Sequence, residues 1–306
     1  MSATYPTAAP SLRSRIGSDP RGGGYYAAPR RYRLHLSLPC PHSLAIAVAH
    51  RLLRLDDALP VTLLPAVPDA PDGGYLALDP LYEASAHHHP GPSIAPVLSD
   101  TWSGRIVSTH APDILRDLAR RFGGDGPDLH PSGAEDSLDQ VGRLCEQVGA
   151  SARLAGRSDA GAPERHTAVG TLLDTLSVLE TRLTSHAYVT PGGLTLADIQ
   201  LWATLVQLDT VHRPRLSAET VRRIAENTQL WAYARRLAQC PEFGGQLDPD
   251  GIEQRRRASD PQAPGAGVPL VDWTAYTSAA TAREVPQWPE SVCGGADVRP
   301  PAVSCD

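Results

Sequence analysis

The stretch YRLHLSLPCPHSLAIAVAHRLLRL, residues 32–55, changes its hydrophobic period halfway along. Up to Leu38, leucines alternate with polar residues, which is the period of a half-buried strand. After Cys40 the apolar residues recur at helical spacing, and Pro41 suits the first helical position because its missing N–H is not needed there. The stretch therefore predicts a strand, a tight turn and a helix, with Cys40 at or next to the helix N-cap.

This position favours a reactive thiolate at Cys40. Free backbone N–H groups and the positive end of the helix dipole can lower a thiol pKa from about 8.5 into a range of roughly 3.5–7.5. The alternative is a cysteine that only packs as a small hydrophobic residue. Because Ser43 stands where a Cys-x-x-Cys pair needs its second cysteine, Cys40 can form a mixed disulfide but not a local one.

Composition limits the class of protein. The chain has 306 residues, 41% hydrophobic and 20% charged, which is long enough for two domains. A formal net charge of −6 argues against a nucleic-acid partner. All 28 basic residues are arginine and 29 residues are proline, which suggests a high-GC bacterial genome. The longest apolar run, Leu44 to Ala49, is too short to span a membrane.

The cysteines indicate a reducing compartment. Their number is odd, their spacing is scattered and no signal-peptide pattern opens the chain, so we expect a cytoplasmic protein. Besides Cys40 they are Cys145, Cys240, Cys293 and Cys305. Cys145 and Cys240 lie in amphipathic helical stretches, where packing is the usual role. Cys293 and Cys305 lie in an irregular tail. Neither setting suggests a catalytic cysteine.

The first half of the chain predicts a mixed sheet. Residues 1–31 have no sustained period and are expected to form an arm or a disordered leader. Residues 60–64 read as a second strand, so that strand, helix and strand form a parallel βαβ unit. Residues 65–92 read as a long loop. Its histidines, His87 to His89, are expected to be solvated, and we predict no metal site there.

A hairpin and a helix complete this half. Residues 93–98 and 105–107 read as the two strands, and residues 111–122 as the helix. Pro96 lies inside a strand pattern, which requires an edge position or a special geometry such as a cis bond. The order βαβ and then ββα is that of a thioredoxin-like domain, with Cys40 at its first helix.

The second half predicts an all-helical domain. Residues 123–132 are rich in Gly, Pro and Asp and mark the boundary. Two long amphipathic segments follow, and then a capping box formed by Thr195 and Asp198. Ser217 and Asn227 can begin two more helices. We therefore predict an N-terminal arm, a thioredoxin-like domain, an all-helical domain and an irregular tail anchored by tryptophans, with bounds of 1–31, 32–125, 133–259 and 260–306.

Four motifs together resemble the glutathione S-transferase superfamily, and in detail its xi class, the glutathionyl-hydroquinone reductases. They are RYRLHLSLPCP at 31–41, APVL at 95–98, SGRIVS at 103–108 and LTLADIQLWATLVQLD at 194–209. The likeness runs in unbroken order from about residue 25 to 275. It implies a thioredoxin-like domain followed by an all-helical domain, and a low-molecular-weight thiol as co-substrate.

The resemblance also implies roles for single residues. Cys40 would be the catalytic nucleophile, and the backbone of Ala95, before a cis Pro96, would pair with the cysteinyl part of the bound thiol. The complete expected thiol site is Pro41, His42, Ala95, Pro96, Val107, Ser108 and His110. His42 could pair with the thiolate or protonate a leaving group, or it could be an exposed residue of the first helical turn.

The chain departs from the family pattern where the family holds its ligands. His110 and Ala111 stand where the family has Glu and Ser for the γ-glutamyl end, and Pro92 replaces an arginine. His212 stands where the family has a tyrosine of its quinone pocket, and it would line the second-substrate pocket. The thiol is therefore glutathione or, in a high-GC actinobacterium, mycothiol.

Three functions remain open at this stage. The first is thiol transfer to, or reductive thiol removal from, a small organic electrophile or conjugate. The second is a tailoring enzyme of specialised metabolism, acting as a thiol-assisted isomerase or a sulfur-incorporating transferase. The third is a non-catalytic binding protein with the same fold. In each case we expect a homodimer, because transferases of this fold commonly pair.

Overall fold

The computed structural model describes residues 12–19, 21, 24–123, 126–262 and 265–277. Its first half contains a four-stranded sheet in the order β2-β1-β3-β4, formed by β1 (Tyr32–Leu36), β2 (Val61–Leu63), β3 (Val97–Asp100) and β4 (Arg105–Ser108). Strands β1 and β2 are parallel, and β3 is antiparallel to both of its neighbours. The predicted βαβ unit and the hairpin after it are both present.

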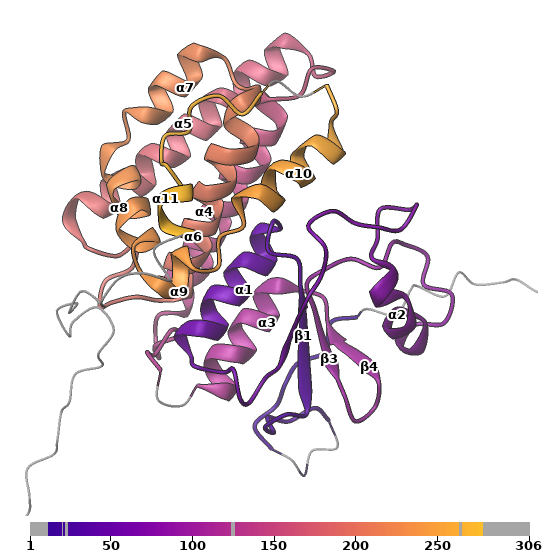
Figure 1. Cartoon of the computed structure of the whole chain (residues 1–306). Coiled ribbons are helices and arrows are strands. Elements are labelled where there is room, and N and C mark those ends of the chain that lie inside the picture. The colour runs from indigo at the N-terminus through magenta and orange to yellow at the C-terminus, as the bar shows by residue number, and fades with distance from the viewer. Residues whose placement is uncertain (1–11, 20, 22–23, 124–125, 263–264, 278–306) are drawn as a thin grey trace, which may run out of the picture.

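Helices cover the two faces of this sheet (Figure 1). On one face lie α1 (Pro41–Leu52) and α3 (Ala111–Asp117), which continues as a π-helical turn, η3 (Leu118–Phe122). The alternating residues of β1 that face them are completely buried, as the period of two predicts: Tyr32, Leu34 and Leu36. The short helix α2 (Asp79–Ser85) covers the other face and closes a smaller hydrophobic cluster.

The described residues from 135 onward contain helices and no strand. The helices are α4 (Glu135–Ala155), α5 (Ala162–Ser185), α6 (Leu196–Gln207), α7 (Ala218–Ala225), α8 (Thr228–Ala238), α9 (Pro241–Gly244), α10 (Pro249–Ser259) and α11 (Thr274–Thr277), with short turns η4 (Leu208–His212) and η5 (Arg213–Arg215). Trp202 of α6 is fully buried, with the rings of Phe243 and Trp273 at 5.2 and 6.2 Å between centroids. A thioredoxin-like domain followed by an all-helical domain is the predicted fold class.

The predicted capping signals begin the helices as expected. Thr195 and Asp198 form a capping box at the start of α6, and Ser217 and Asn227 are the N-caps of α7 and α8. Asp198 is completely buried, and it accepts hydrogen bonds from the backbone N–H of Thr195 at 2.8 Å and from the Tyr233 hydroxyl at 2.8 Å. This carboxylate therefore ties α6 to α8 as well as capping α6.

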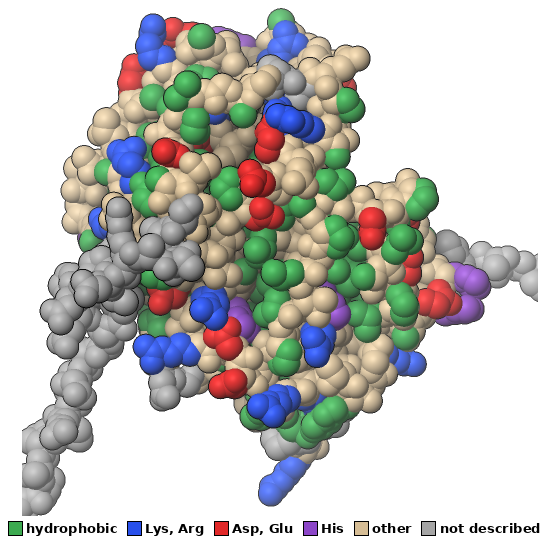
Figure 2. Space-filling view, viewed as in Figure 1, with side chains coloured by type: hydrophobic (Ala, Val, Ile, Leu, Met, Phe, Trp, Pro, Cys, Tyr) green, Lys and Arg blue, Asp and Glu red, His purple; other side chains and the backbone are tan. Residues whose placement is uncertain are grey.

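The two parts of the molecule meet along α1, which packs against α6 and α9. Figure 2 shows the surface hollowed where they meet, with hydrophobic side chains inside the hollow and charged groups of both signs around it. Within the described residues, no helix is both long and apolar enough to cross a membrane.

The described residues of the N-terminal arm pack on the sheet, a contact that the sequence did not predict. Ser14 donates its backbone N–H to Val107 O at 2.8 Å, and Thr109 donates to Leu12 O at 2.9 Å. Arg15 pairs with Asp117 of α3 at 2.5 Å. The arm shows no hydrophobic period, because only a few of its residues form strand-like hydrogen bonds. Residues 12–14 form them with the free edge of β4. A local sequence pattern cannot reveal such an edge contact.

One further segment differs from the prediction, and the described part of the tail is anchored by a tryptophan as predicted. The stretch read as a loop, residues 65–92, contains α2, which is too short to give a clear helical period. In the tail, Trp273 is buried inside the same chain and donates its indole N–H to Asp209 at 2.9 Å. Trp273 therefore needs no partner subunit to cover it, and Trp288 lies outside the described residues.

Candidate active site

Cys40 is the N-cap of α1, as the sequence predicts. Its backbone N–H bonds to Ser37 O at 2.9 Å, and its own carbonyl accepts the N–H of Leu44 at 2.8 Å. Pro41 occupies the start of the helix. The turn thus presents the Cys40 sulfur at the helix N-terminus, and the residue is partly exposed to solvent.

The surroundings of Cys40 make its thiol more acidic than usual. Burial alone would raise its pKa, but a hydrogen bond from His42, the backbone N–H of Ser43, and the positive charges of His42 and Arg255 outweigh burial and lower the pKa to about 7. A substantial fraction of Cys40 is therefore a thiolate at neutral pH, which is the form that attacks electrophiles and disulfides.

His42 is the partner of this thiolate. Its hydrogen bond to Cys40 raises the pKa of the imidazole, burial opposes this, and the charges of Cys40 and Glu146 raise it while Arg153 lowers it. The side chain itself is exposed on the first turn of α1. The structure thus places His42 on the exposed first turn, as one of the two predictions has it, and its role toward Cys40 stays a prediction.

Arg255 is a member of the site that sequence reasoning missed. It extends from α10 to the sheet domain, where its guanidinium donates to Tyr75 Oη at 2.9 Å, Ser37 Oγ at 3.3 Å and Ala66 O at 3.4 Å. Its charge helps to lower the pKa of Cys40. No local sequence pattern links residues so far apart.

The remaining residues of the expected thiol site lie before β3, on β4 and at the start of α3. The Ala95–Pro96 peptide bond is cis, as expected from proline inside a strand pattern. Val107 is completely buried and Ser108 is 1% exposed, with its hydroxyl accepting the N–H of His110 at 3.1 Å. His110 is the N-cap of α3, so it lies at a helix N-terminus, and its Nδ1 is 3.0 Å from a carboxylate oxygen of Asp113 without forming a hydrogen bond.

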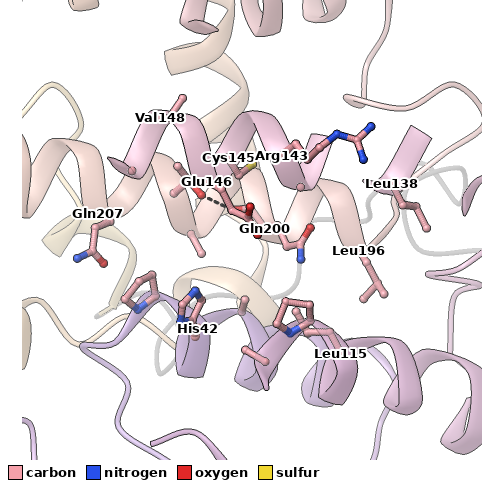
Figure 3. A pocket seen from close by; sticks show the side chains of 18 of the residues that line it. His42, Leu115, Leu138, Arg143, Cys145, Glu146, Val148, Leu196, Gln200 and Gln207 are labelled. Carbon is pink, nitrogen blue, oxygen red and sulfur yellow. Dashed lines mark hydrogen bonds between the residues drawn. The ribbon is translucent and has the colours of Figure 1, made fainter. Parts of the chain in front are cut away.

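A cavity of about 570 Å³ lies between the two domains. Of the predicted residues it brings together Pro41, His42 and His212. Those outside its lining are Cys40, Ala95, Pro96, Val107, Ser108 and His110. Figure 3 shows His42 and Leu115 on one side, facing α4 and α6 on the other. Apolar lining residues alternate with amides and charged groups, so the cavity suits an amphipathic small molecule.

His212 is the most deeply placed polar side chain of this cavity. It is 7% exposed, and burial together with the charges of Arg153 and Arg215 lowers its pKa to about 4. The imidazole is therefore neutral at pH 7. No described residue forms a hydrogen bond with its ring nitrogens, which open onto the cavity.

The other described cysteines lack this environment. Cys145 faces the cavity from α4, but burial raises its pKa to about 12, so that it stays a thiol. The sequence predicts Cys240 inside an amphipathic helical stretch, but it precedes Pro241 at the start of α9 and so repeats the Cys-Pro arrangement. It is buried, however, and its Sγ donates to Glu242 at 2.7 Å. Cys293 and Cys305 lie outside the described residues.

The histidine run after α2 is mostly exposed, as predicted. His87 bonds to Glu83, and these two with His88 bring one ligand atom each within 4.8 Å of one another. Two of the three imidazoles thus lie on one side, stacked at 3.9 Å between centroids, while His89 packs on Tyr82. All three groups are exposed, an arrangement that is common without an ion.

Comparison with known proteins agrees with this architecture. The model of the glutathione S-transferase C-terminal domain family matches residues 151–236. The glutathionyl-hydroquinone reductase YqjG of Escherichia coli K12 is 28% identical over 250 residues, which is 75% of each chain. PcpF of Sphingobium chlorophenolicum, also a glutathionyl-hydroquinone reductase, is 27% identical over 252 residues, or 73% of this chain and 78% of its own.

The solved structures give the same result. The glutathione-bound structure of YqjG superposes with a TM-score of 0.72 at 25% identity, covering 84% of this chain and 91% of that one. The chain is therefore a member of the glutathione S-transferase superfamily that resembles its xi class.

Proposed function

We propose that this protein is a thiol-dependent reductase of the glutathione S-transferase kind, with Cys40 as its nucleophile. One observation carries the proposal: Cys40, with a pKa of about 7, caps α1, and His42, whose side chain helps to lower that pKa, lines the interdomain cavity. A thiolate whose neighbour lines a cavity for an organic molecule supports thiol chemistry on that molecule. Two relatives of matching length are glutathionyl-hydroquinone reductases.

The reaction that fits a single cysteine has two steps. The Cys40 thiolate attacks the sulfur of a thioether conjugate, so that an S–S bond forms and the C–S bond breaks. The bonding electrons leave with the ring carbon, which takes a proton, and His42 is placed to supply it. A second thiolate of the same small thiol then attacks the mixed disulfide, which frees a disulfide and restores Cys40. The two thiol sulfurs are oxidised and the ring carbon is reduced.

We infer the identity of the thiol co-substrate from the residues at the N-terminus of α3. YqjG has been solved with glutathione bound, but in this chain His110 and Ala111 stand at the N-terminus of α3. The nearest buried carboxylate, Asp113, already contacts Arg13, Arg15 and His110. We therefore infer that no carboxylate remains here for the γ-glutamyl ammonium group, and that the natural thiol is mycothiol.

Calorimetry tests this choice of thiol. We expect glutathione to bind more weakly than mycothiol, with no saturation in the low micromolar range, because its ammonium group would lose an ion pair. Saturation by glutathione at low micromolar concentration would show that the inferred pocket is wrong.

Replacement of single cysteines tests the nucleophile. Conjugates of 1,4-hydroquinone with glutathione and with mycothiol serve as substrates, and release of the hydroquinone is measured. We expect Cys40→Ser to lose turnover but keep its circular dichroism spectrum, since a serine hydroxyl still caps a helix but stays protonated without a general base. Cys145→Ser and Cys240→Ser are matched controls and should keep turnover. Full turnover in Cys40→Ser would leave only a bound thiol as nucleophile.

We also propose the organisation in which this chemistry takes place. The thioredoxin-like domain would extend over residues 32–125 and the all-helical domain over 133–259, and the protein would act in the cytoplasm as a homodimer. Light scattering at micromolar concentration that gives the 32.6 kDa of one chain would rule out the dimer.

A further inference from the structure

We propose that the interdomain cavity selects an acidic organic acceptor, whose ionised oxygen binds Arg153 and whose neighbouring hydroxyl or carbonyl oxygen binds His212. This inference rests on the proposed function, because it names the molecule on which Cys40 acts. It departs from a plain hydroquinone acceptor, which carries no anionic group at neutral pH.

The first argument is that the imidazole of His212 can receive a ligand. The residue as a whole is only 7% exposed, but its ring nitrogens are not among the sealed atoms without a partner, so they open onto the cavity. Among the described residues His212 has no hydrogen-bond partner, and it lines the cavity from the end of η4. As a neutral ring it offers one N–H donor and one acceptor nitrogen to an oxygen of the ligand.

The second argument is the position of Arg153. It lines the cavity from α4, together with His42 of α1 and His212 of η4. Its positive charge lowers the pKa of both histidines. No described carboxylate lies within 4.0 Å of its guanidinium nitrogens. An arginine without a partner beside a neutral hydrogen-bonding ring suits a carboxylate or phenolate with an adjacent oxygen.

The other charged side chains of the cavity do not cancel the preference for an anionic ligand. Arg116 and Asp139 pair at 3.0 Å and offset each other. Glu146 faces His42 and raises its pKa, while the guanidinium of Arg143 extends away from His42 in Figure 3. With Arg153 included, the unpaired lining side chains carry one net positive charge.

The size and walls of the cavity define the rest of the ligand. Its 570 Å³ lies within the range of about 300–1,000 Å³ that drug-sized ligands occupy. Ala45, Leu115, Leu138, Val148 and Ala203 give it apolar surfaces from both domains. A fused aromatic system of two or more rings that carries a carboxylate next to a hydroxyl group fits these surfaces and both polar groups.

Binding of matched probes tests the proposal. The probes are 1-hydroxy-2-naphthoate, its methyl ester and 2-naphthoate, titrated by calorimetry into the full chain carrying Cys40→Ser, so that no reaction can occur. We expect the acid to bind about fivefold more tightly than the ester, the gain of one partly solvated ion pair. Arg153→Gln should remove this preference, whereas Arg143→Gln, the same change on the same helix, should keep it.

His212 is tested with the pair that differs in the hydroxyl group. His212→Phe should weaken 1-hydroxy-2-naphthoate more than 2-naphthoate, and His212→Asn should recover part of the difference. Equal binding of acid and ester, or an acid preference that survives Arg153→Gln, would overturn the proposal. These titrations need no Cys40 thiol. A failed titration with Cys40-dependent turnover intact would overturn only the acidic acceptor, whereas successful titrations without Cys40-dependent turnover would overturn only the proposed function.

Discussion

Cys40 and Cys240 each precede a proline that begins a helix, and they show why position alone does not activate a thiol. Cys40 caps a helix of twelve residues, is partly exposed and contacts His42. Cys240 caps a helix of four residues, is 5% exposed and donates to a carboxylate. A thiolate needs both access and a positive neighbour, and only Cys40 has both among the described cysteines.

The pH dependence of alkylation tests the role of His42. With a pKa of about 7, Cys40 is mostly protonated below pH 7 and mostly thiolate above it, so its rate with iodoacetamide should rise through about pH 7. His42→Gln removes the imidazolium and should move this midpoint up towards the ordinary thiol value of about 8.5. His50→Gln, in the last turn of the same helix, should leave it unchanged. An unchanged midpoint in His42→Gln would mean that the helix N-terminus alone activates Cys40.

At the scale of elements, α6 and α10 hold the site by long-range contacts. The buried Asp198 joins the start of α6 to Tyr233 of α8, and Arg255 joins α10 to Tyr75 and the Ser37 turn beside Cys40. Both contacts use a charged group with several hydrogen bonds, so its loss leaves buried donors or acceptors without partners.

Asp198→Ala should destabilise the protein by about 3 kcal/mol or more, because four donors, two backbone N–H groups and two hydroxyls, lose their acceptor in a buried setting. Denaturant unfolding measures this change. Asp174→Ala, on the exposed side of α5, should change stability by less than about 0.5 kcal/mol. Equal effects of the two substitutions would contradict the role given to the capping box.

Arg255→Met should slow alkylation of Cys40 at pH 7 and lower stability by about 1–3 kcal/mol, since the Tyr75 hydroxyl, on a side chain that is 1% exposed, loses its partner. Arg257→Met is the control, because Arg257 is exposed and only pairs with Glu253 on its own helix. If Cys40 is alkylated at the same rate in both variants, Arg255 contributes to packing but not to the acidity of Cys40.

At the scale of the whole molecule, neutral histidines make the fold sensitive to acid. Burial and nearby arginines lower the pKa of His35 and of His212 to about 4. The unfolded chain takes up these protons at about pH 6.5. Stability that is complete above pH 6.5 is therefore lost progressively as the pH falls from 6.5 to 4, by at most about 1.4 kcal/mol per pH unit for each histidine.

Urea unfolding at pH 7 and pH 5 checks this dependence. The double variant His35→Gln and His212→Gln should lose less stability between the two pH values than the wild-type chain. His166→Gln, which changes an exposed histidine of α5, should behave as the wild type. An undiminished loss in the double variant would assign the acid sensitivity to other groups.

The sequence by itself determined the features that depend on neighbours along the chain. The change of period across residues 32–55, the Pro41 helix start and the Thr195–Asp198 box all follow from side-chain alternation and from the free N–H groups of a helix end. Each such signal lies within a few residues, so fold class, Cys40 and most helices could be predicted without coordinates.

Only the tertiary structure decided what approaches these elements from far away in the chain. Arg255 lies beside Cys40 because α10 packs back on the sheet domain, and Arg153 and His212 meet His42 because α4 and η4 line the same cavity as α1. The edge of β4 binds the N-terminal arm for the same reason. Such contacts depend on how buried surfaces fit together, which no local period or spacing encodes.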